Sequence, residues 1–358
     1  MAAMQPKSMA VFNSNDIYPI GADSTMPFEQ HRDLFYLSGV DQEESVLLLF
    51  PDCPNEELRE VLFVRETNAH IAVWEGEKLT KDAAFKTSGI KTVYWLQDLE
   101  KILFEMASYA DTFYINTNEH YRAAVETETR EDRFTKWLLA KYPAHSVAKS
   151  NPILQRLRAV KDQIELDLMQ NACDITEKGF RRILDFVKPG VWEYEIEAEL
   201  LHEYVRNRSK GFAYTPIIAS GNNANVLHYV ENNQRKEGDL ILFDTAAEYA
   251  NYKSDLSRTI PVSGTFTKRQ KEVYNAVNHV KKEATKLLVP GTIWKDYHLE
   301  VGKLMTSELL NLGLLDKADV QNEDPKWPAY KKYFMHGTSH HIGLDTHDYG
   351  LLHEPMQA

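Results

Sequence analysis

The pair Pro-Gly occurs twice in the second half of this chain, each time between two segments with helical periodicity. A long amphipathic segment ends in V-K-P-G-V-W at residues 187–192 and is followed by a second one over residues 193–208. The pattern returns as L-V-P-G-T-I-W at residues 288–294. Proline and glycine break helices, so both sites are predicted to be helix-to-helix junctions. Two interpretations are open: a common turn used twice, or a duplicated unit of helices and sheet with a site where the halves meet.

Short apolar runs alternate with amphipathic stretches in the first half of the chain. The runs predict strands at residues 44–50, 61–64, 70–74 and 91–96, and the stretches predict helices at residues 81–87, 98–109 and 129–142. Such alternation is typical of an α/β layered domain. A Ser-Asn-Pro break begins at Ser150 and precedes a long helical segment. We therefore predict an α/β domain over residues 1–150 and a second domain over residues 151–358.

The composition excludes several classes of protein. The 358 residues exceed the size of one ordinary core, which agrees with two domains. A net charge of −12 argues against a nucleic-acid backbone or an anionic membrane as a partner. No apolar run approaches the ~20 residues of a membrane span, and Cys53 and Cys173 lack the spacing of a metal or disulfide motif. We expect a cytoplasmic protein without nucleic-acid or membrane partners.

Two aspartates interrupt a predicted β-hairpin. Asp244 lies in the apolar run of residues 239–247, and Asp255 lies in the partner run of residues 252–262. The short link between the runs lets the two carboxylates face each other across the ladder. Opposed like charges destabilise a sheet unless a cation lies between them, and oxygen ligands suit Mn²⁺ or Mg²⁺. The alternative without a metal is that Asp255 pairs with Arg258 and Asp244 caps a turn.

Four of the 13 histidines lie close together near the end of the chain, at His336, His340, His341 and His347. Imidazole is the commonest transition-metal ligand, and it titrates near neutral pH. We therefore expect a reaction centre here rather than part of a core. Imidazole combined with carboxylates widens the choice of metal to Co²⁺, Zn²⁺ and Fe²⁺.

Three motifs resemble those of a known family. They are I-I-A-S-G-N-N-A-N-V-L-H-Y-V-E at residues 217–231, D-T-A-A-E-Y-A-N-Y-K-S-D-L-S-R-T-I-P at residues 244–261, and H-G-T-S-H-H-I-G-L-D-T-H-D at residues 336–348. In order and spacing they resemble the aminopeptidase P and prolidase branch of the pita-bread metallopeptidases, family M24. The run P-F-E-Q-H-R-D-L-F-Y-L-S-G at residues 27–39 resembles the N-terminal domain of aminopeptidase P.

The resemblance implies a fold class for each half. The first half would be an α/β N-terminal domain. The second would be an α+β pita-bread domain, of the creatinase and aminopeptidase type, in which a duplication surrounds a dinuclear metal site. The resemblance therefore favours a duplicated unit as the origin of the Pro-Gly repeat.

The resemblance also implies roles for seven side chains, and none for His341. Those that would bind metal are Asp244, Asp255 and His340. Those that would act in catalysis without being permanent ligands are His228 and His347. Those that would contact the substrate are His336 and Tyr214, the latter as a wall of the proline pocket. The implied cofactor is two divalent ions, Mn²⁺ first, with Co²⁺ or Zn²⁺ as alternatives. The implied partners are proline-containing peptides and further copies of the chain, in a homodimer or homotetramer.

The resemblance ends before the last part of the family pattern. Two further glutamate ligands are expected downstream of the histidine motif, in an E-P-G-x-Y strand and an R-x-E-D strand, and neither motif occurs in this sequence. We therefore expect a Xaa-Pro aminopeptidase truncated at its C-terminus, with an incomplete catalytic domain. The alternatives are a Xaa-Pro dipeptidase (prolidase) or, if the chain ends at Ala358, a metal-poor pita-bread module that binds peptides.

Overall fold

The computed structural model describes residues 1–118, 126–232, 239–351, 354 and 356. It consists of two compact units, Met1–Gln155 and Arg156–Ala358, which we call the N-terminal unit and the C-terminal unit. The division falls inside helix α6 (Asn151–Ala159). Because α6 runs across the division, the domain boundary at residue 150 stays a prediction.

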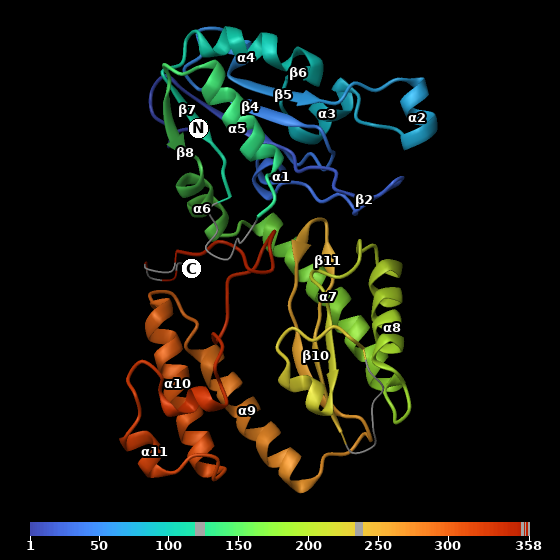
Figure 1. Ribbon diagram of the computed structural model, residues 1–358, viewed down its shortest axis with the longest axis vertical. Coiled ribbons are helices and arrows are strands. Elements are labelled where there is room, and N and C mark those ends of the chain that lie inside the picture. The colour runs from blue at the N-terminus through green and yellow to red at the C-terminus, as the bar shows by residue number, and fades with distance from the viewer. Residues whose placement is uncertain (119–125, 233–238, 352–353, 355, 357–358) are drawn as a thin grey trace. The chain divides into compact units, whose positions relative to one another are not determined.

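Within the described residues, a six-stranded mixed sheet forms the centre of the N-terminal unit (Figure 1). Its strands are β1 (Ser8–Asn13), β4 (Val46–Leu49), β5 (Glu60–Val64), β6 (Thr92–Trp95), β7 (Thr112–Ile115) and β8 (Ser146–Lys149). They are arranged in the order β6-β5-β4-β1-β7-β8. Strand β4 is antiparallel to β1 and β5, whereas the other neighbouring pairs are parallel. A separate antiparallel ribbon is formed by β2 (Pro19–Gly21) and β3 (Ser24–Thr25).

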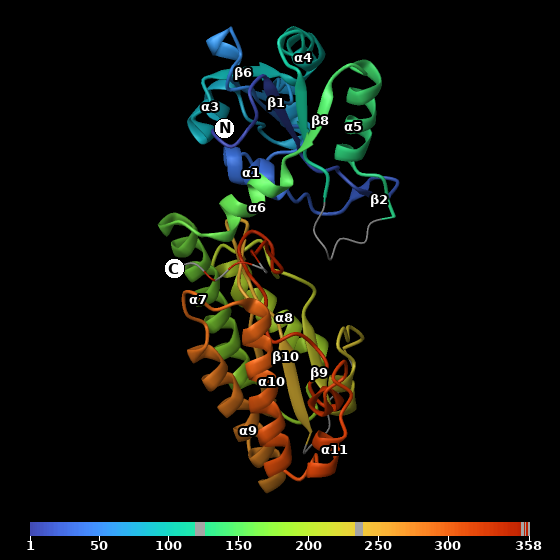
Figure 2. The ribbon, with the colours of Figure 1, turned by 90° about the vertical axis from the view of Figure 1, so that its left-hand side faces the viewer.

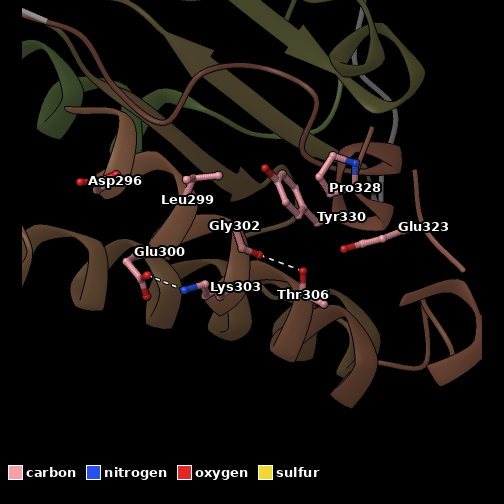
Figure 3. A pocket seen from close by; sticks show the side chains of 9 residues that line it. All are labelled: Asp296, Leu299, Glu300, Gly302, Lys303, Thr306, Glu323, Pro328 and Tyr330. Atoms are coloured by element: carbon pink, nitrogen blue, oxygen red, sulfur yellow. Dashed lines mark hydrogen bonds and ion pairs between the residues drawn. The ribbon is translucent and has the colours of Figure 1, made fainter. Parts of the chain in front are cut away.

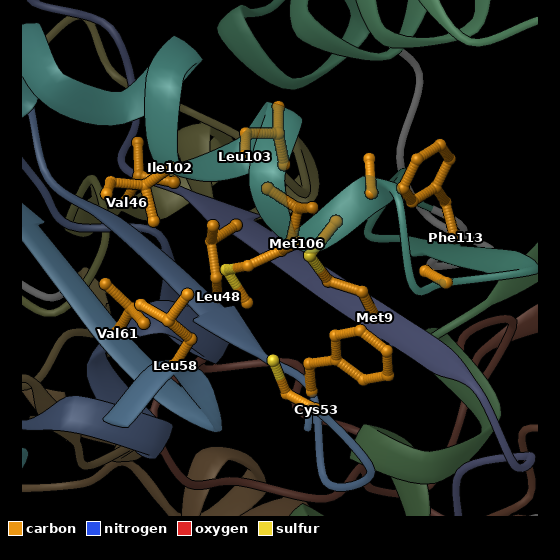
Figure 4. Close-up of a cluster of buried hydrophobic side chains, with 14 of the residues drawn as sticks. Met9, Val46, Leu48, Cys53, Leu58, Val61, Ile102, Leu103, Met106 and Phe113 are labelled. Carbon is orange, nitrogen blue, oxygen red and sulfur yellow. The ribbon is translucent and has the colours of Figure 1, made fainter. Parts of the chain in front are cut away.

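Helices pack on both faces of this sheet. The helices of the unit that precede α6 are α1 (Arg32–Ser38), α2 (Ala69–Glu75), α3 (Lys81–Ser88), α4 (Leu99–Ala107) and α5 (Arg130–Lys141). Successive side chains of a strand point to opposite faces, which divides β1 between two cores. Met9 packs with Leu103 of α4 and Phe113 of β7 (Figure 4). Phe12 packs in the other core, with Leu34 of α1.

Most elements predicted for the first half are confirmed. The predicted helices at 81–87, 98–109 and 129–142 are α3, α4 and α5, and the predicted strands at 44–50, 61–64 and 91–96 are β4, β5 and β6. The strand predicted at residues 70–74 is wrong, because these residues lie in helix α2. Asn68 Oδ1 accepts hydrogen bonds of 3.0 Å from the N–H groups of His70 and Ile71, which caps the start of this helix.

Two helices pack on one face of a three-stranded antiparallel sheet in the described part of the C-terminal unit (Figure 1). The helices are α7 (Gln163–Phe186) and α8 (Glu193–Arg206), and the strands are β9 (Ile217–Ser220), β10 (Leu240–Asp244) and β13 (Ser257–Pro261). The strand order is β13-β10-β9. Ile183, Leu200 and Phe243 are buried in the core between helices and sheet. A small hairpin of β11 (Glu248–Tyr249) and β12 (Tyr252–Lys253) interrupts the chain between β10 and β13.

A second pair of helices lies side by side in both views (Figures 1 and 2). These helices are α9 (Lys268–Lys286) and α10 (Trp294–Asn311), and the short helix α11 (Lys317–Gln321) follows. Both predicted Pro-Gly junctions are confirmed: Gly190 lies between α7 and α8, and Gly291 lies between α9 and α10. Their φ angles of 89° and 92° favour glycine. Even the longest of the described helices lacks the apolar stretch that a bilayer crossing requires.

Candidate active site

The two predicted hairpin aspartates lie near the end of the β10–β13 ladder. Asp244, the last residue of β10, is paired with Ser257, so the direct opposition predicted for Asp244 and Asp255 is wrong. Asp255 lies between β12 and β13, because the β11–β12 hairpin is inserted in the chain between the paired strands β10 and β13. At the turn of this hairpin, Asn251 has a φ of 71°, and its N–H donates to Glu248 Oε1 over 2.6 Å. The ladder register thus differs from the prediction.

One tyrosine hydroxyl nevertheless joins the two carboxylates. Tyr214 Oη lies 2.6 Å from Asp244 Oδ1 and 2.8 Å from Asp255 Oδ1. The hydroxyl carries one proton, so it donates to one carboxylate at a time. Tyr214 therefore lies between the two groups for which the sequence predicts a shared cation.

The histidine segment reaches these carboxylates through Asp255. His340 Nε2 lies 3.0 Å from Asp255 Oδ2, and His340 Nδ1 lies 3.0 Å from the carbonyl oxygen of His341. The contact between Nδ1 and a backbone carbonyl oxygen fixes the orientation of the imidazole ring. The ring centres of His340 and His347 are 3.9 Å apart. The structure thus brings together five of the seven predicted side chains: Tyr214, Asp244, Asp255, His340 and His347.

The surroundings shift the pKa values of the two carboxyl groups in opposite directions. Burial raises the pKa of Asp244, and the charge of Asp255 adds to this effect. Burial also acts on Asp255, but hydrogen bonds from His340 and Tyr214 outweigh it and lower the pKa of Asp255. Burial and the two neighbouring carboxylates raise the pKa of the Tyr214 phenol, so the phenol stays protonated at neutral pH. Groups with perturbed pKa values gather at functional sites more often than elsewhere.

The other two predicted site residues, His228 and His336, are exposed. The ring of His336 packs edge-on against Phe334, with ring centres 4.9 Å apart. His228 precedes Tyr229, whose hydroxyl donates to Glu193 Oε2 over 2.8 Å. Among the residues that the structure describes, no hydrogen bond or ring contact connects either histidine with the group of five. Their roles therefore stay predictions.

His341 is a packing residue. Its ring stacks on Trp294, with ring centres 4.9 Å apart and an interplanar angle of 27°. A methyl group added to Gly350 would lie 1.7 Å from the same ring, so the ring needs the space that glycine leaves. Burial lowers the pKa of His341. These contacts explain why the cluster contains a histidine without an implied role.

Sequence reasoning missed a buried ion-pair cluster beside the histidines. The Asp348 side chain is 1% exposed and directly follows His347. Arg158 Nη2 lies 2.6 Å from Asp348 Oδ1, and Lys161 Nζ lies 3.1 Å from Asp348 Oδ2. One signal was present, since two basic residues three positions apart follow the break at Ser150. The sequence alone does not pair them with Asp348.

The donor atoms at this site suit a divalent cation. Two carboxylates and an imidazole are a common ligand set for Mn²⁺, Co²⁺ and Zn²⁺. Asp244 and Asp255 each place an oxygen against one shared hydroxyl, and His340 has its second ring nitrogen held by a carbonyl group. In the described ranges, no group of three or more His, Cys, Asp or Glu side chains is arranged to hold an ion. The residues thus fit a cation by the chemistry of their donor atoms, while the Tyr214 hydroxyl lies between the carboxylates.

A cavity of about 330 Å³ lies elsewhere in the C-terminal unit, along α10 (Figure 3). Leu299, Gly302 and Thr306 of α10 line it, together with Pro328 and Tyr330. The Tyr330 ring covers Gly302, where an added methyl group would lie 2.7 Å from the ring. None of the seven predicted site residues lines this cavity. We therefore do not assign the active site to it.

Comparison with known families decides the class of this protein. Residues 167–357 match metallopeptidase family M24, and residues 1–114 match the aminopeptidase P N-terminal domain. The first match covers more than half of the chain. The chain belongs to metallopeptidase family M24. The M24 segment contains all seven predicted site residues, and residues 115–166 lie outside both matches.

Relatives of this M24 protein agree along most of its length. Xaa-Pro aminopeptidase of Escherichia coli is 32% identical over 97% of this chain and 79% of the relative. Human Xaa-Pro aminopeptidase 3 is 29% identical over 94% of this chain and 66% of the relative. Zinc-substituted E. coli aminopeptidase P in complex with product has a TM-score of 0.87 at 30% identity, over 99% of this chain and 81% of that one. Pseudomonas aeruginosa aminopeptidase PepP has a TM-score of 0.85 at 29% identity, over 98% of this chain and 78% of that one.

These matches confirm the family, the fold class and the enzyme class that the motifs predict. The M24 protein combines an aminopeptidase P N-terminal domain with a pita-bread domain, and it is a metallopeptidase. Membership of the family implies divalent metal ions, and one of the solved relatives is a zinc-substituted form.

Proposed function

We propose that this M24 protein hydrolyses the bond between a first residue and a following proline and so releases the first residue of Xaa-Pro peptides. That bond is a tertiary amide, because proline has no N–H. The similarity to Xaa-Pro aminopeptidases of E. coli and human supports this substrate class. The observation that carries the proposal is the convergence of five side chains within the M24 segment: Tyr214, Asp244, Asp255, His340 and His347.

The proposed cofactor is two divalent ions, with Mn²⁺ favoured and Co²⁺ or Zn²⁺ as alternatives. Asp244, Asp255 and His340 would hold them, because carboxylate and imidazole are suitable donors. When bound, such ions supply an activated water and Lewis acidity at neutral pH. Two carboxylates balance half the charge of two divalent ions, so we expect the second ion to bind more weakly than the first.

The side chains of the protein bind the peptide and move protons. We assign proton transfer to the leaving imino nitrogen to His347, and binding of the negative charge that develops on the carbonyl oxygen to His228. We assign the free amine of the substrate to a position near Asp244. His336 and the ring of Tyr214 are assigned to the proline side chain. The Tyr214 hydroxyl is hydrogen-bonded to the carboxylates, which leaves its ring for contact with the substrate.

Two peptide series test the substrate class with purified protein and Mn²⁺. Release of the first residue from Xaa-Pro-Yaa tripeptides, and not from N-acetylated copies of them, is expected of an aminopeptidase. Cleavage confined to Xaa-Pro dipeptides would instead indicate a prolidase. Peptide binding without any cleavage, in protein shown to contain metal, would favour a binding module and contradict the proposal.

A cytoplasmic location and a homodimer or homotetramer complete the proposal. The location is supported by Cys53 and Cys173, which are both free thiols. Fractionation of cells and analytical ultracentrifugation test the two expectations. Recovery outside the cytoplasm or sedimentation as a monomer would contradict them.

A further inference from the structure

Asp348 is the centre of a buried ion-pair cluster that the proposed chemistry does not use. The side chains of Asp348, Arg158 and Lys161 are 1%, 3% and 9% exposed. Arg158 Nη2 donates to Asp348 Oδ1 over 2.6 Å and to Asp345 Oδ2 over 2.8 Å, while Lys161 Nζ donates to Asp348 Oδ2 over 3.1 Å. Each carboxylate oxygen of Asp348 thus has a cationic partner, as a buried charge requires.

Contacts of Asp348 and Tyr349 also fix the backbone that directly follows His347. The N–H of Asp348 donates to the carbonyl oxygen of His341 over 3.0 Å, which closes the segment between them into a loop. The N–H of Tyr349 donates to Asp348 Oδ1 over 2.8 Å. The guanidinium of Arg158 lies 4.7 Å from the centre of the Tyr349 ring. His347 is therefore attached to a residue whose position is set by several independent contacts.

Gly343 connects the same loop to the β11–β12 hairpin. A methyl group added to it would lie 2.0 Å from Asp348 Oδ2 and 2.8 Å from Lys161 Cε, so the cluster closes around a position without a side chain. The carbonyl oxygen of Gly343 accepts a 2.8 Å hydrogen bond from the N–H of Lys253. Lys253 lies in β12, two positions before Asp255. The loop is thus held by the cluster on one side and by the strand leading to Asp255 on the other.

We propose that Asp348, held by Arg158 and Lys161, is a positioning residue that keeps His347 beside His340 at the active site. The inference rests on the proposed function, because it assigns Asp348 to the same reaction. The Asp348 carboxylate is directed at the side chains of Arg158 and Lys161, so it acts through the backbone of the loop rather than on the substrate. A buried carboxylate with a cation on each oxygen has few alternative positions, and a small displacement of a catalytic histidine costs rate.

Substitution of Arg158 and Lys161 tests the proposal, and an exposed ion pair nearby serves as the control. Arg158→Met and Lys161→Met each remove one partner of Asp348. Arg156→Met removes the nearby pair with Glu354, whose N–O distance is 2.8 Å and whose side chains are 65% and 40% exposed. The measurements are kcat and KM on a Xaa-Pro-Yaa peptide, the NMR signals of ¹⁵N-labelled histidine rings, and thermal melting to verify folding.

We expect both methionine variants to shift the ring signals of His340 and His347 and to lower kcat by about tenfold to a hundredfold, with KM nearly unchanged. Arg158→Lys keeps the charge but loses the planar guanidinium that bonds both Asp345 and Asp348, so an intermediate loss is expected. Arg156→Met should leave the ring signals and kcat unchanged. If Arg158→Met does not fold, Lys161→Met and Arg158→Lys provide the same readouts.

Folded Lys161→Met and Arg158→Lys with wild-type ring signals and wild-type kcat would overturn the proposal. An equal loss in Arg156→Met would overturn it as well, because the effect would then not depend on the buried cluster. If the wild-type protein cleaves no Xaa-Pro peptide, the proposed function fails. The histidine signals still decide the positioning role in that case.

Discussion

His340 Nε2 lies 3.0 Å from Asp255 Oδ2, although the two residues come from distant parts of the M24 segment. Asp255 in turn shares the hydroxyl of Tyr214 with Asp244. The carboxylate of Asp255 thus connects His340 with Tyr214 and Asp244, which ends strand β10 of the three-stranded sheet. A change in one of these side chains should therefore alter the environment of the others.

Tyr214→Phe should destabilise the metal-free protein at neutral pH. The substitution removes the donor that two carboxylates share, and the loss of a hydrogen bond to a charged group costs about 1.5–3 kcal/mol. Urea unfolding in the presence of a chelator measures the change in the free energy of unfolding. Added Mn²⁺ should restore part of the loss, because a cation can take the place of the hydroxyl. The exposed Tyr333 provides the control, and equal stability of Tyr214→Phe and Tyr333→Phe would contradict this account.

Glu131 should make the stability of the protein fall as the pH rises from weakly acidic to neutral. It is 7% exposed in the first turn of α5, and Asn13 Nδ2 donates to its Oε2 over 2.9 Å. Burial raises the pKa of Glu131 from 4.5 to about 7. Between these values the native state binds more protons than the unfolded state, so the free energy of unfolding decreases with rising pH. The decrease should be on the order of 3 kcal/mol across this window.

Glu131→Gln tests this pH dependence, because the amide keeps an oxygen for Asn13 and cannot ionise. Denaturant unfolding of both proteins across the window should show a falling free energy of unfolding for the wild type and a flatter profile for the variant. Parallel profiles would show that Glu131 is not the responsible group.

Gly343→Ala should destabilise the loop that carries the histidines. The added methyl group would lie 2.0 Å from Asp348 Oδ2, so the buried cluster must shift, at a cost of about 1–3 kcal/mol. Gly337→Ala, at a position between His336 and His340, is the matched control, since no atom lies within 4 Å of its added methyl group. Thermal melting compares the two variants. A Gly343→Ala protein as stable as Gly337→Ala would disprove the close approach of Asp348 to this position.

Local sequence patterns predicted most elements of the N-terminal unit, because their apolar periodicity matches the side of the element that is buried. Residues 61–64 lie in β5 and are buried without exception, as expected of a strand covered on both faces. The error at residues 70–74 has a local cause. Val73 and Trp74 are apolar but 78% and 76% exposed, and the cap provided by Asn68 starts a helix there. When apolar residues are exposed, their spacing in the sequence does not show reliably whether a segment is a helix or a strand.

The residues of the candidate site were predicted from the motif resemblance, whereas their contacts were not predicted. The motif resemblance selected all five side chains that converge, but the position of the Tyr214 hydroxyl between the carboxylates depends on three-dimensional contacts. The register of β10 with β13 depends in the same way on the intervening small hairpin. The pairing of Arg158 with Asp348 joins distant segments and has no periodic signal.

We propose that Asp244, Asp255 and His340 hold the metal with which this M24 protein cleaves Xaa-Pro bonds. Asp255→Asn keeps the shape of the side chain and removes the charge. The most direct measurement is the rate of release of the first residue from a Xaa-Pro-Yaa peptide, together with the Mn²⁺ content of wild type and variant. We expect the variant to lose metal and at least about a hundredfold in kcat/KM, while it remains folded. Wild-type activity of Asp255→Asn with a normal metal content would contradict the account.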